Sequence, residues 1–253
     1  MVAMKAEAGN YFYTEGILLK RQHYKESSLL CRVLTRDFGL ISIIATGALK
    51  EKSSFTGLLE PFNRLQLDLY RTPRGQIFNL RSAQLTDKSN IRMNYQKKLL
   101  VNAASELLLQ TDFAIGEGEE FFLLLSEYVN YLQKTDYHPF LIFLRYINRF
   151  LILLGIPYDA ACVKCHCREF NYFFPQEDGF LCSKCFRPIL SDNLLRLQDD
   201  TADLIQNIFN LSALDEKQIN RTSVEEIKNI LLIHLANHFN KPFHLNSLKD
   251  YMS

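Results

Sequence analysis

The chain has 253 residues, of which 47% are hydrophobic, so it can bury a sizeable core and form one large or two modest domains. Its 29 basic and 28 acidic residues nearly balance, which excludes a uniformly basic protein of the histone type. The charge is uneven, however, because the segment up to Leu85 carries twelve basic and seven acidic side chains. The sequence shows no signal-peptide pattern and no apolar run long enough to span a bilayer, so we expect a cytoplasmic protein without membrane contact.

The segment from Tyr11 to about Leu85 predicts five short β-strands separated by turns. Between Arg64 and Tyr70 every second residue is a leucine, which is the period of a strand with one face in a core. Asp37-Phe38-Gly39 and Thr72-Pro73-Arg74-Gly75 are typical hairpin turns. Five such strands suit a small closed barrel, because closure removes exposed sheet edges. The expected strands cover residues 13–20, 27–35, 40–46, 63–71 and 76–85.

After Asn90 the hydrophobic period changes to that of helices. Apolar residues recur at spacings of three and four from Leu99 to Leu108, and Gly155-Ile156-Pro157 is a typical helix end. Thr222 with Glu225 forms a capping-box pattern at the start of the last long helix. The other expected helices cover residues 119–133, 139–154, 194–209 and 224–239.

These patterns predict an α+β protein with two domains. Residues 1–87 are expected to form an OB-fold-like five-stranded β-barrel. Residues 88–253 are expected to form an all-helical domain that carries a four-cysteine zinc-knuckle insert at about residues 158–190.

The strongest chemical motif is a pair of C-x2-C sequences, Cys162/Cys165 and Cys182/Cys185, with sixteen residues between the pairs. This spacing predicts one tetrahedral zinc ion bound by four thiolates, with Asp178-Gly179 as the turn that brings the second pair back. Four thiolates leave no position for a water molecule, so the zinc is expected to be structural.

Two alternatives remain open for this cysteine segment. The cysteines could be free and buried without metal, or His166 or Cys167 could replace one of the four ligands. Lys164 and Lys184 lie inside the two motifs and are expected to offset part of the thiolate charge.

Basic residues of the predicted barrel form a second candidate site. On an OB-like barrel, basic side chains and aromatic rings can follow a phosphate backbone and stack bases, and Tyr24 and Tyr70 are the nearest rings. The alternative is an ordinary solvated surface. The candidate DNA-binding residues are Lys50, Lys52, Lys20, Arg21, Arg71 and Arg74, with Lys25 beside them.

Catalytic motifs are not visible in the sequence. His234 and His238 lie one helical turn apart, but Leu235 stands where a zinc protease needs glutamate, so we expect structural or surface histidines. The sequence also lacks a phosphate-binding loop, a dinucleotide fingerprint and a serine-hydrolase elbow. We therefore expect a protein that is not an enzyme.

The order of several motifs resembles the bacterial RecO family of recombination mediators over nearly the whole chain. The paired C-x2-C motifs after Leu154-Gly155-Ile156-Pro157 are similar to the zinc-bearing helical domain of that family. The other segments that carry the resemblance are Gly16–Lys20, Tyr24–Leu30, Leu34–Gly39, Gly47–Lys50, Leu59–Phe62 and Lys241–Phe243.

The resemblance implies a protein of the RecF-pathway type that binds single- and double-stranded DNA and anneals complementary strands. It also implies a RecR-like partner, the acidic C-terminal tail of the single-strand-binding protein SSB, the indirect partner RecA, and a cytoplasmic, nucleoid-associated location. The resemblance assigns DNA contact first to Lys50 and Lys52. Leu49 and Glu51 interrupt the run of basic residues that many members of the family have in this loop, which predicts weaker DNA binding. The alternative is a zinc-stabilised interaction module whose basic barrel binds acidic protein tails and not DNA.

Overall fold

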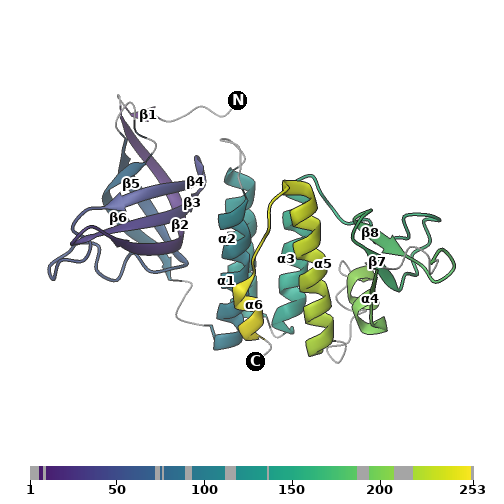
Figure 1. The fold of residues 1–253 in the computed structure, drawn as a ribbon. Helices are drawn as coiled ribbons and strands as arrows, with labels where there is room; N and C mark the ends of the chain where they lie inside the picture. Colours follow the sequence, from purple (N-terminus) through teal and green to yellow (C-terminus); the bar gives the residue numbers. More distant parts are fainter. Residues whose placement is uncertain are drawn as a thin grey trace. The chain divides into compact units, whose positions relative to one another are not determined.

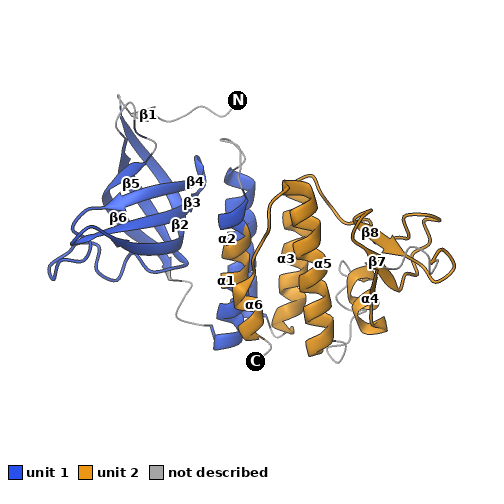
Figure 2. Cartoon of the chain, in the orientation of Figure 1, with its two compact units in different colours: residues 1–101, 108–135 blue, residues 102–107, 136–253 orange. Residues whose placement is uncertain are grey.

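The computed structural model describes residues 6–7, 10–71, 75, 77–88, 93–111, 118–135, 137–186, 194–207 and 219–251. It divides into two compact units, residues 1–101 with 108–135 and residues 102–107 with 136–253 (Figure 2). The first unit contains the sheet and helix α2 (Gly118–Lys134), and the domain boundary expected after residue 87 stays a prediction. Among the described helices, none combines the length and the apolar character that a bilayer crossing requires.

Five strands of the first unit close into a barrel (Figure 1). Around the barrel each strand pairs with the next in the order β2-β3-β4-β6-β5, and β5 pairs again with β2. All of these pairings are antiparallel except β4 with β6, which is parallel. This confirms the expected OB-like barrel. The strands are β2 (Tyr11–Tyr24), β3 (Ser28–Thr35), β4 (Gly39–Ala45), β5 (Asn63–Tyr70) and β6 (Phe78–Lys88), and the short β1 (Ala6–Glu7) pairs with the start of β2.

Strand β2 is long because it serves both sides of the barrel. Its first half pairs with β5 and its second half with β3, and the register shifts between Leu18 and Lys20. Such a bulge bends a strand and increases its twist, which is what closure requires. Gly16 lies where the two pairings overlap, and a Cβ there would lie 2.6 Å from Cγ1 of Val33. Only glycine fits at this crossing without displacing its neighbours.

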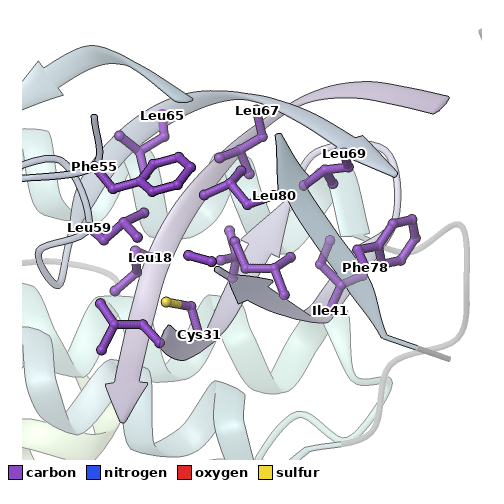
Figure 3. Close-up of a cluster of buried hydrophobic side chains, with 14 of the residues drawn as sticks. Leu18, Cys31, Ile41, Phe55, Leu59, Leu65, Leu67, Leu69, Phe78 and Leu80 are labelled. Carbon is purple, nitrogen blue, oxygen red and sulfur yellow. The ribbon is translucent and has the colours of Figure 1, made fainter. Parts of the chain in front are cut away.

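The barrel core is one cluster of buried hydrophobic side chains from its strands (Figure 3), and along β4 and β5 the buried residues alternate with half-buried ones. Leu65, Leu67 and Leu69 of β5 are fully buried, which confirms the alternation predicted for this strand. Cys31, the cysteine outside the clustered segment, is also buried here. Burial raises the pKa of its thiol to about 11, against a smaller opposite effect of Arg21, so Cys31 stays a neutral core residue.

Helix α2 packs against the barrel within the first unit. Gly118 at its start lies so close to the β3–β4 turn that a Cβ there would be 2.4 Å from Cα of Gly39. Arg64 of β5 binds both carboxylate oxygens of Glu15 and donates a hydrogen bond to Ser126 of α2, 3.1 Å away. Its guanidinium also lies 5.3 Å from the centre of the Phe122 ring. A bidentate pair of this kind fixes orientation as well as adding energy.

The second unit contains the remaining helices together with the middle of α1. Pro139 starts α3, and Gly155 ends it with φ of +74°, as expected for this segment. The N–H of Ile156 bonds to the carbonyl of Leu151 and that of Gly155 to Ile152, which is a Schellman motif. The helices are α1 (Tyr95–Gln110), α3 (Pro139–Leu153), α4 (Asp199–Gln206), α5 (Arg221–Phe239) and α6 (Asn246–Tyr251).

Two details of the helix prediction were wrong. The cap of α5 is Asn220 and not Thr222: the Asn220 side chain accepts from the N–H of Ser223, and Ser223 Oγ accepts from the N–H of Asn220. Asparagine is at least as good a cap as threonine, so the helix starts one residue before Thr222. The helix expected from Leu194 begins only at Asp199, because β9 (Leu195–Arg196) pairs with β7 (Tyr172–Phe174) instead.

A small three-stranded sheet, which the sequence did not predict, carries the cysteine segment. Its order is β8-β7-β9, where β8 is Gly179–Leu181, and β7 and β8 form a hairpin. Phe173 and Phe180 of this sheet pack with Ile230 of α5 in one buried cluster. Hereafter we call residues 158–186 the metal lobe.

Candidate metal centre and nucleic-acid interface

The four paired cysteines meet at one point of the metal lobe. The sulfur atoms of Cys162, Cys165, Cys182 and Cys185 all lie within 4.8 Å of one another, and those of Cys165 and Cys182 are 3.7 Å apart. A tetrahedron with zinc–sulfur bonds of about 2.3 Å has edges of about 3.8 Å. The donor set therefore fits one ion of the size and softness of Zn²⁺.

Backbone hydrogen bonds hold both cysteine pairs in tight turns. In the first, the N–H of His166 bonds to the Cys162 carbonyl at 2.8 Å, with His166 in the left-handed region at φ of +58°. In the second, the N–H of Cys185 bonds to the Cys182 carbonyl at 3.1 Å. The two turns meet because the N–H of Val163 bonds to the carbonyl of Phe180. A Cβ at Gly179 would lie 2.2 Å from Cγ1 of Val163, so the hairpin needs glycine there.

The close approach of these thiols changes their acidity. Burial opposes ionisation of Cys182, but the backbone of Cys185 and the neighbouring thiols bond to its sulfur and lower its pKa to about 6. Hydrogen bonds to Cys165 and Cys182 raise the pKa of Cys185 to about 12. A metal ion that binds such thiols displaces their shared protons into the solvent.

The two alternative ligands lie beside the group of four. Cys167 donates a hydrogen bond from its thiol to the carbonyl of Glu169 at 3.2 Å. Its pKa is raised to about 12, chiefly by a hydrogen bond to Cys165. His166 supplies its backbone to the first turn. The cysteine group that converges among the described residues contains the four paired cysteines, without Cys167 or His166.

Of the two lysines inside the motifs, Lys164 has an acidic partner that was not expected. The ammonium of Lys164 lies 2.6 Å from the carboxylate of Glu177 in an exposed ion pair. Its charge is matched by that carboxylate, so it offsets less of the thiolate charge than the sequence suggested. Lys184 is exposed in the second turn.

The two histidines of α5 have different environments. His234 is buried and bonded through both ring nitrogens, to Asp178 and to the carbonyl of Ile156, whereas the His238 side chain is 42% exposed. The sequence predicted structural or surface histidines only because Leu235 stands where a zinc protease has glutamate. Asp178, which contacts both histidines, lies 56 residues away from His234 in the sequence, so the sequence did not indicate this contact.

The candidate DNA-binding lysines are exposed on the first unit. Lys50 and Lys52 lie in a loop whose turns are closed by backbone bonds from Lys50 to Gly47 and from Ser53 to Lys50. Lys20 is exposed beside a groove of about 280 Å³ lined also by Gln22, Leu30, Arg32 and Leu109. These lysines therefore present their charge to solvent.

The candidate arginines are less available than the lysines. Arg21 bonds to Glu60 at 2.8 Å and to the carbonyl of Leu59 at 3.0 Å. Arg71 is partly buried, with its guanidinium 4.9 Å from the centre of the Phe78 ring. Arg74 lies outside the described residues.

Two exposed tyrosines, Tyr11 and Tyr13, were not among the rings predicted to bind DNA. Tyr13 of β2 is 62% exposed and Tyr11 is 42% exposed, on the outer side of the barrel. The Tyr11 ring lies 5.3 Å from that of Tyr70, and the guanidinium of Arg81 lies 4.7 Å over it. We call Tyr11, Tyr13, Tyr70 and Arg81 the tyrosine face. Tyr24, the other expected ring, is covered by Lys25 at 5.3 Å.

Comparison with known proteins defines the class. Two family models match the chain: Recombination protein O N terminal over residues 10–88, and Recombination protein O C terminal over residues 94–247. The first match coincides with the barrel and the second spans most of the helices and the metal lobe. The chain therefore has the architecture of a recombination protein in both parts.

Individual relatives agree with both family models. The DNA repair protein RecO of Thermodesulfovibrio yellowstonii is 30% identical over 178 residues, which cover 69% of this chain and 70% of that protein. That of Syntrophus aciditrophicus is 29% identical over 195 residues, 74% of each chain. That of Bacillus pumilus is 24% identical over 221 residues, 86% of this chain and 85% of the relative. The chain belongs to the RecO family.

Proposed function

We propose that this protein is a DNA-repair recombination mediator without catalytic activity. It binds single- and double-stranded DNA, anneals complementary strands and helps to load a recombinase on DNA coated by SSB. The observation that carries the proposal is the match of both family models, over residues 10–88 and 94–247. The location that follows is the cytoplasm, at the nucleoid.

The barrel supports DNA contact of the sequence-independent kind. Lys50, Lys52 and Lys20 present cations to solvent, and the tyrosine face presents rings with an arginine beside them. Cations follow a phosphate backbone, and rings stack on any base. Annealing needs no covalent chemistry, since two polyanionic strands approach once their charge is neutralised.

The metal lobe has a structural role in this proposal. One Zn²⁺ bound by Cys162, Cys165, Cys182 and Cys185 has no open coordination position, so it holds the lobe together and activates no water. The helical part is the proposed docking region for a RecR-like protein and for the acidic tail of SSB. RecA is the proposed indirect partner.

The second candidate function is a zinc-stabilised interaction module whose barrel binds acidic protein tails and not DNA. The exposed Lys50 and Lys52 also suit such a partner. The tyrosine face favours DNA, because stacking contributes about 1–3 kcal/mol per base and an acidic peptide tail gains little from it.

A binding and annealing experiment tests the proposal. The full chain is titrated into a labelled single-stranded oligonucleotide, and the annealing rate of two complementary oligonucleotides is measured with and without protein. We expect binding and faster annealing. If the chain binds an acidic peptide but no oligonucleotide even at low salt, the interaction module replaces the mediator.

Replacing Tyr13 by alanine is expected to weaken single-stranded DNA binding by about 1–3 kcal/mol, through the loss of one stacked base. Tyr13→Phe should restore most of the affinity, because the ring is retained. The matched control is Tyr95→Ala, which removes another exposed ring, on α1. Anisotropy with the same oligonucleotide measures both, and equal affinities of Tyr13→Ala and the unaltered chain would remove the tyrosine face from the DNA path.

A further inference from the structure

A second group of metal-ligating side chains lies outside the four cysteines. Asp178 in the β7–β8 turn and His234 and His238 on α5 bring one carboxylate oxygen and two ring nitrogens within 4.8 Å of one another. Asp178 Oδ2 lies 2.7 Å from Nδ1 of His234 and 3.2 Å from Nε2 of His238. His234 and His238, which are four residues apart on α5, thus converge with Asp178 from the β7–β8 turn.

The hydrogen bonds of His234 determine what can lie at this point. Its Nε2 is 2.8 Å from the carbonyl of Ile156, which only accepts, so Nε2 carries the hydrogen. In the neutral ring, Nδ1 then has a lone pair, and this lone pair faces the carboxylate of Asp178. Two acceptors at 2.7 Å repel, so a proton or a metal cation must lie between them.

Three features favour a cation. A backbone carbonyl that receives the second ring N–H is the usual orienting partner of a metal-bound histidine. Asp178 Oδ1 is buried and, within the described part of the chain, has no hydrogen-bond partner, so a second carboxylate oxygen is available as a ligand. The exposed His238 leaves the group open to solvent on one side, which provides an entry path.

The distances are compatible with an ion of moderate size. Ligands at about 2.0–2.1 Å from a tetrahedral ion are about 3.3 Å apart. The His238–Asp178 separation of 3.2 Å already fits, and the His234–Asp178 separation of 2.7 Å must open by about half an ångström. The Tyr158 ring, 4.1 Å from that of His234, keeps the imidazole plane in place while it does so.

We propose that Asp178, His234 and His238 form a second metal site, which takes Zn²⁺ or a similar borderline divalent cation in addition to the ion at the four cysteines. Two imidazoles and one carboxylate are a common donor set for such ions. The site would connect the β7–β8 turn to α5, where Asn237 already donates a hydrogen bond to the carbonyl of Pro175.

The test uses the full chain without an affinity tag that binds metal. After dialysis against micromolar Zn²⁺, metal analysis is expected to give about two ions per chain, and about one for His238→Ala. Co²⁺ added to a chain that holds one equivalent of Zn²⁺, at the four cysteines, should give weak nitrogen–oxygen type bands, without the intense thiolate-to-metal absorption of a cysteine site. His238 is exposed, so its replacement should leave the fold intact.

Two further variants complete this test. Asp178→Asn keeps the shape and removes the anionic ligand, so it should also lose the second ion, while His23→Ala removes an exposed imidazole of the barrel and should retain it. The proposal would be overturned if the unaltered chain and His238→Ala both bound one ion and Co²⁺ gave no spectrum apart from that of the thiolate site. A proton would then lie between His234 and Asp178.

Discussion

Cys182→Ser is expected to lose the thiolate-bound metal and to unfold the metal lobe together with α5, while the barrel stays folded. A structural zinc ion contributes about 10–16 kcal/mol of apparent binding free energy in small zinc domains, and a whole protein is stable by only about 5–15 kcal/mol. Removing one of four ligands therefore removes a large part of the local stability. Metal content and amide exchange of α5 and of the barrel strands measure the two effects.

The matched control for this variant is Cys167→Ser. Cys167 lies beside the four cysteines but its thiol bonds to the carbonyl of Glu169, so this change should retain the metal. Equal metal loss in both variants would make Cys167 a ligand. A Cys182→Ser chain that is as stable as the unaltered protein would show that the lobe does not depend on metal.

Single-stranded DNA binding is expected to weaken by about 50-fold between about 50 and 200 mM salt. This follows if about four phosphates are contacted, because the logarithm of the affinity then falls with a slope of about −3 against the logarithm of the salt concentration. Replacing Lys50 and Lys52 together by alanine should lower the size of that slope by about 1 to 1.5, alike for all sequences. Anisotropy titrations at several salt concentrations measure the slope.

The control removes the same charge elsewhere. Lys98 and Lys249 are exposed on helices α1 and α6, and their double replacement by alanine should leave the slope unchanged. If both double variants lose the same affinity, the effect comes from net charge and not from the loop. A loss that depends on base sequence would argue against backbone contact by Lys50 and Lys52.

Features encoded by local patterns could be predicted from the sequence. The leucine alternation of β5, the glycine at the end of α3 and the tight turn within each cysteine pair each depend on neighbours within a few residues, and the structure contains all three. The predicted cap of α5 was wrong because Asn220 and Thr222 both have side chains that favour the N-cap position. Local preference does not separate two such candidates.

Features that depend on distant residues were missed. Arg21 looked like a free cation in the sequence, but Glu60 from 39 residues away binds it. Strand β9 pairs only because the metal lobe supplies β7 as a partner. The pairing of Asp178 with His234 and the exposure of the tyrosine face likewise exist only in the folded chain. No periodicity reports such contacts.

The contacts along α5 determine how the second unit opens. Glu226 accepts hydrogen bonds from the N–H of Gln198 and from Thr201, Ile230 packs against the aromatic residues of the small sheet, and His234 and Asn237 bond to the β7–β8 turn. Segments joined at so many successive turns of one helix open together and not singly. We therefore expect the metal lobe, α4 and α5 to open as one cooperative unit, so that the amides of β7 and β8 are protected from hydrogen exchange to the same degree as those of α5.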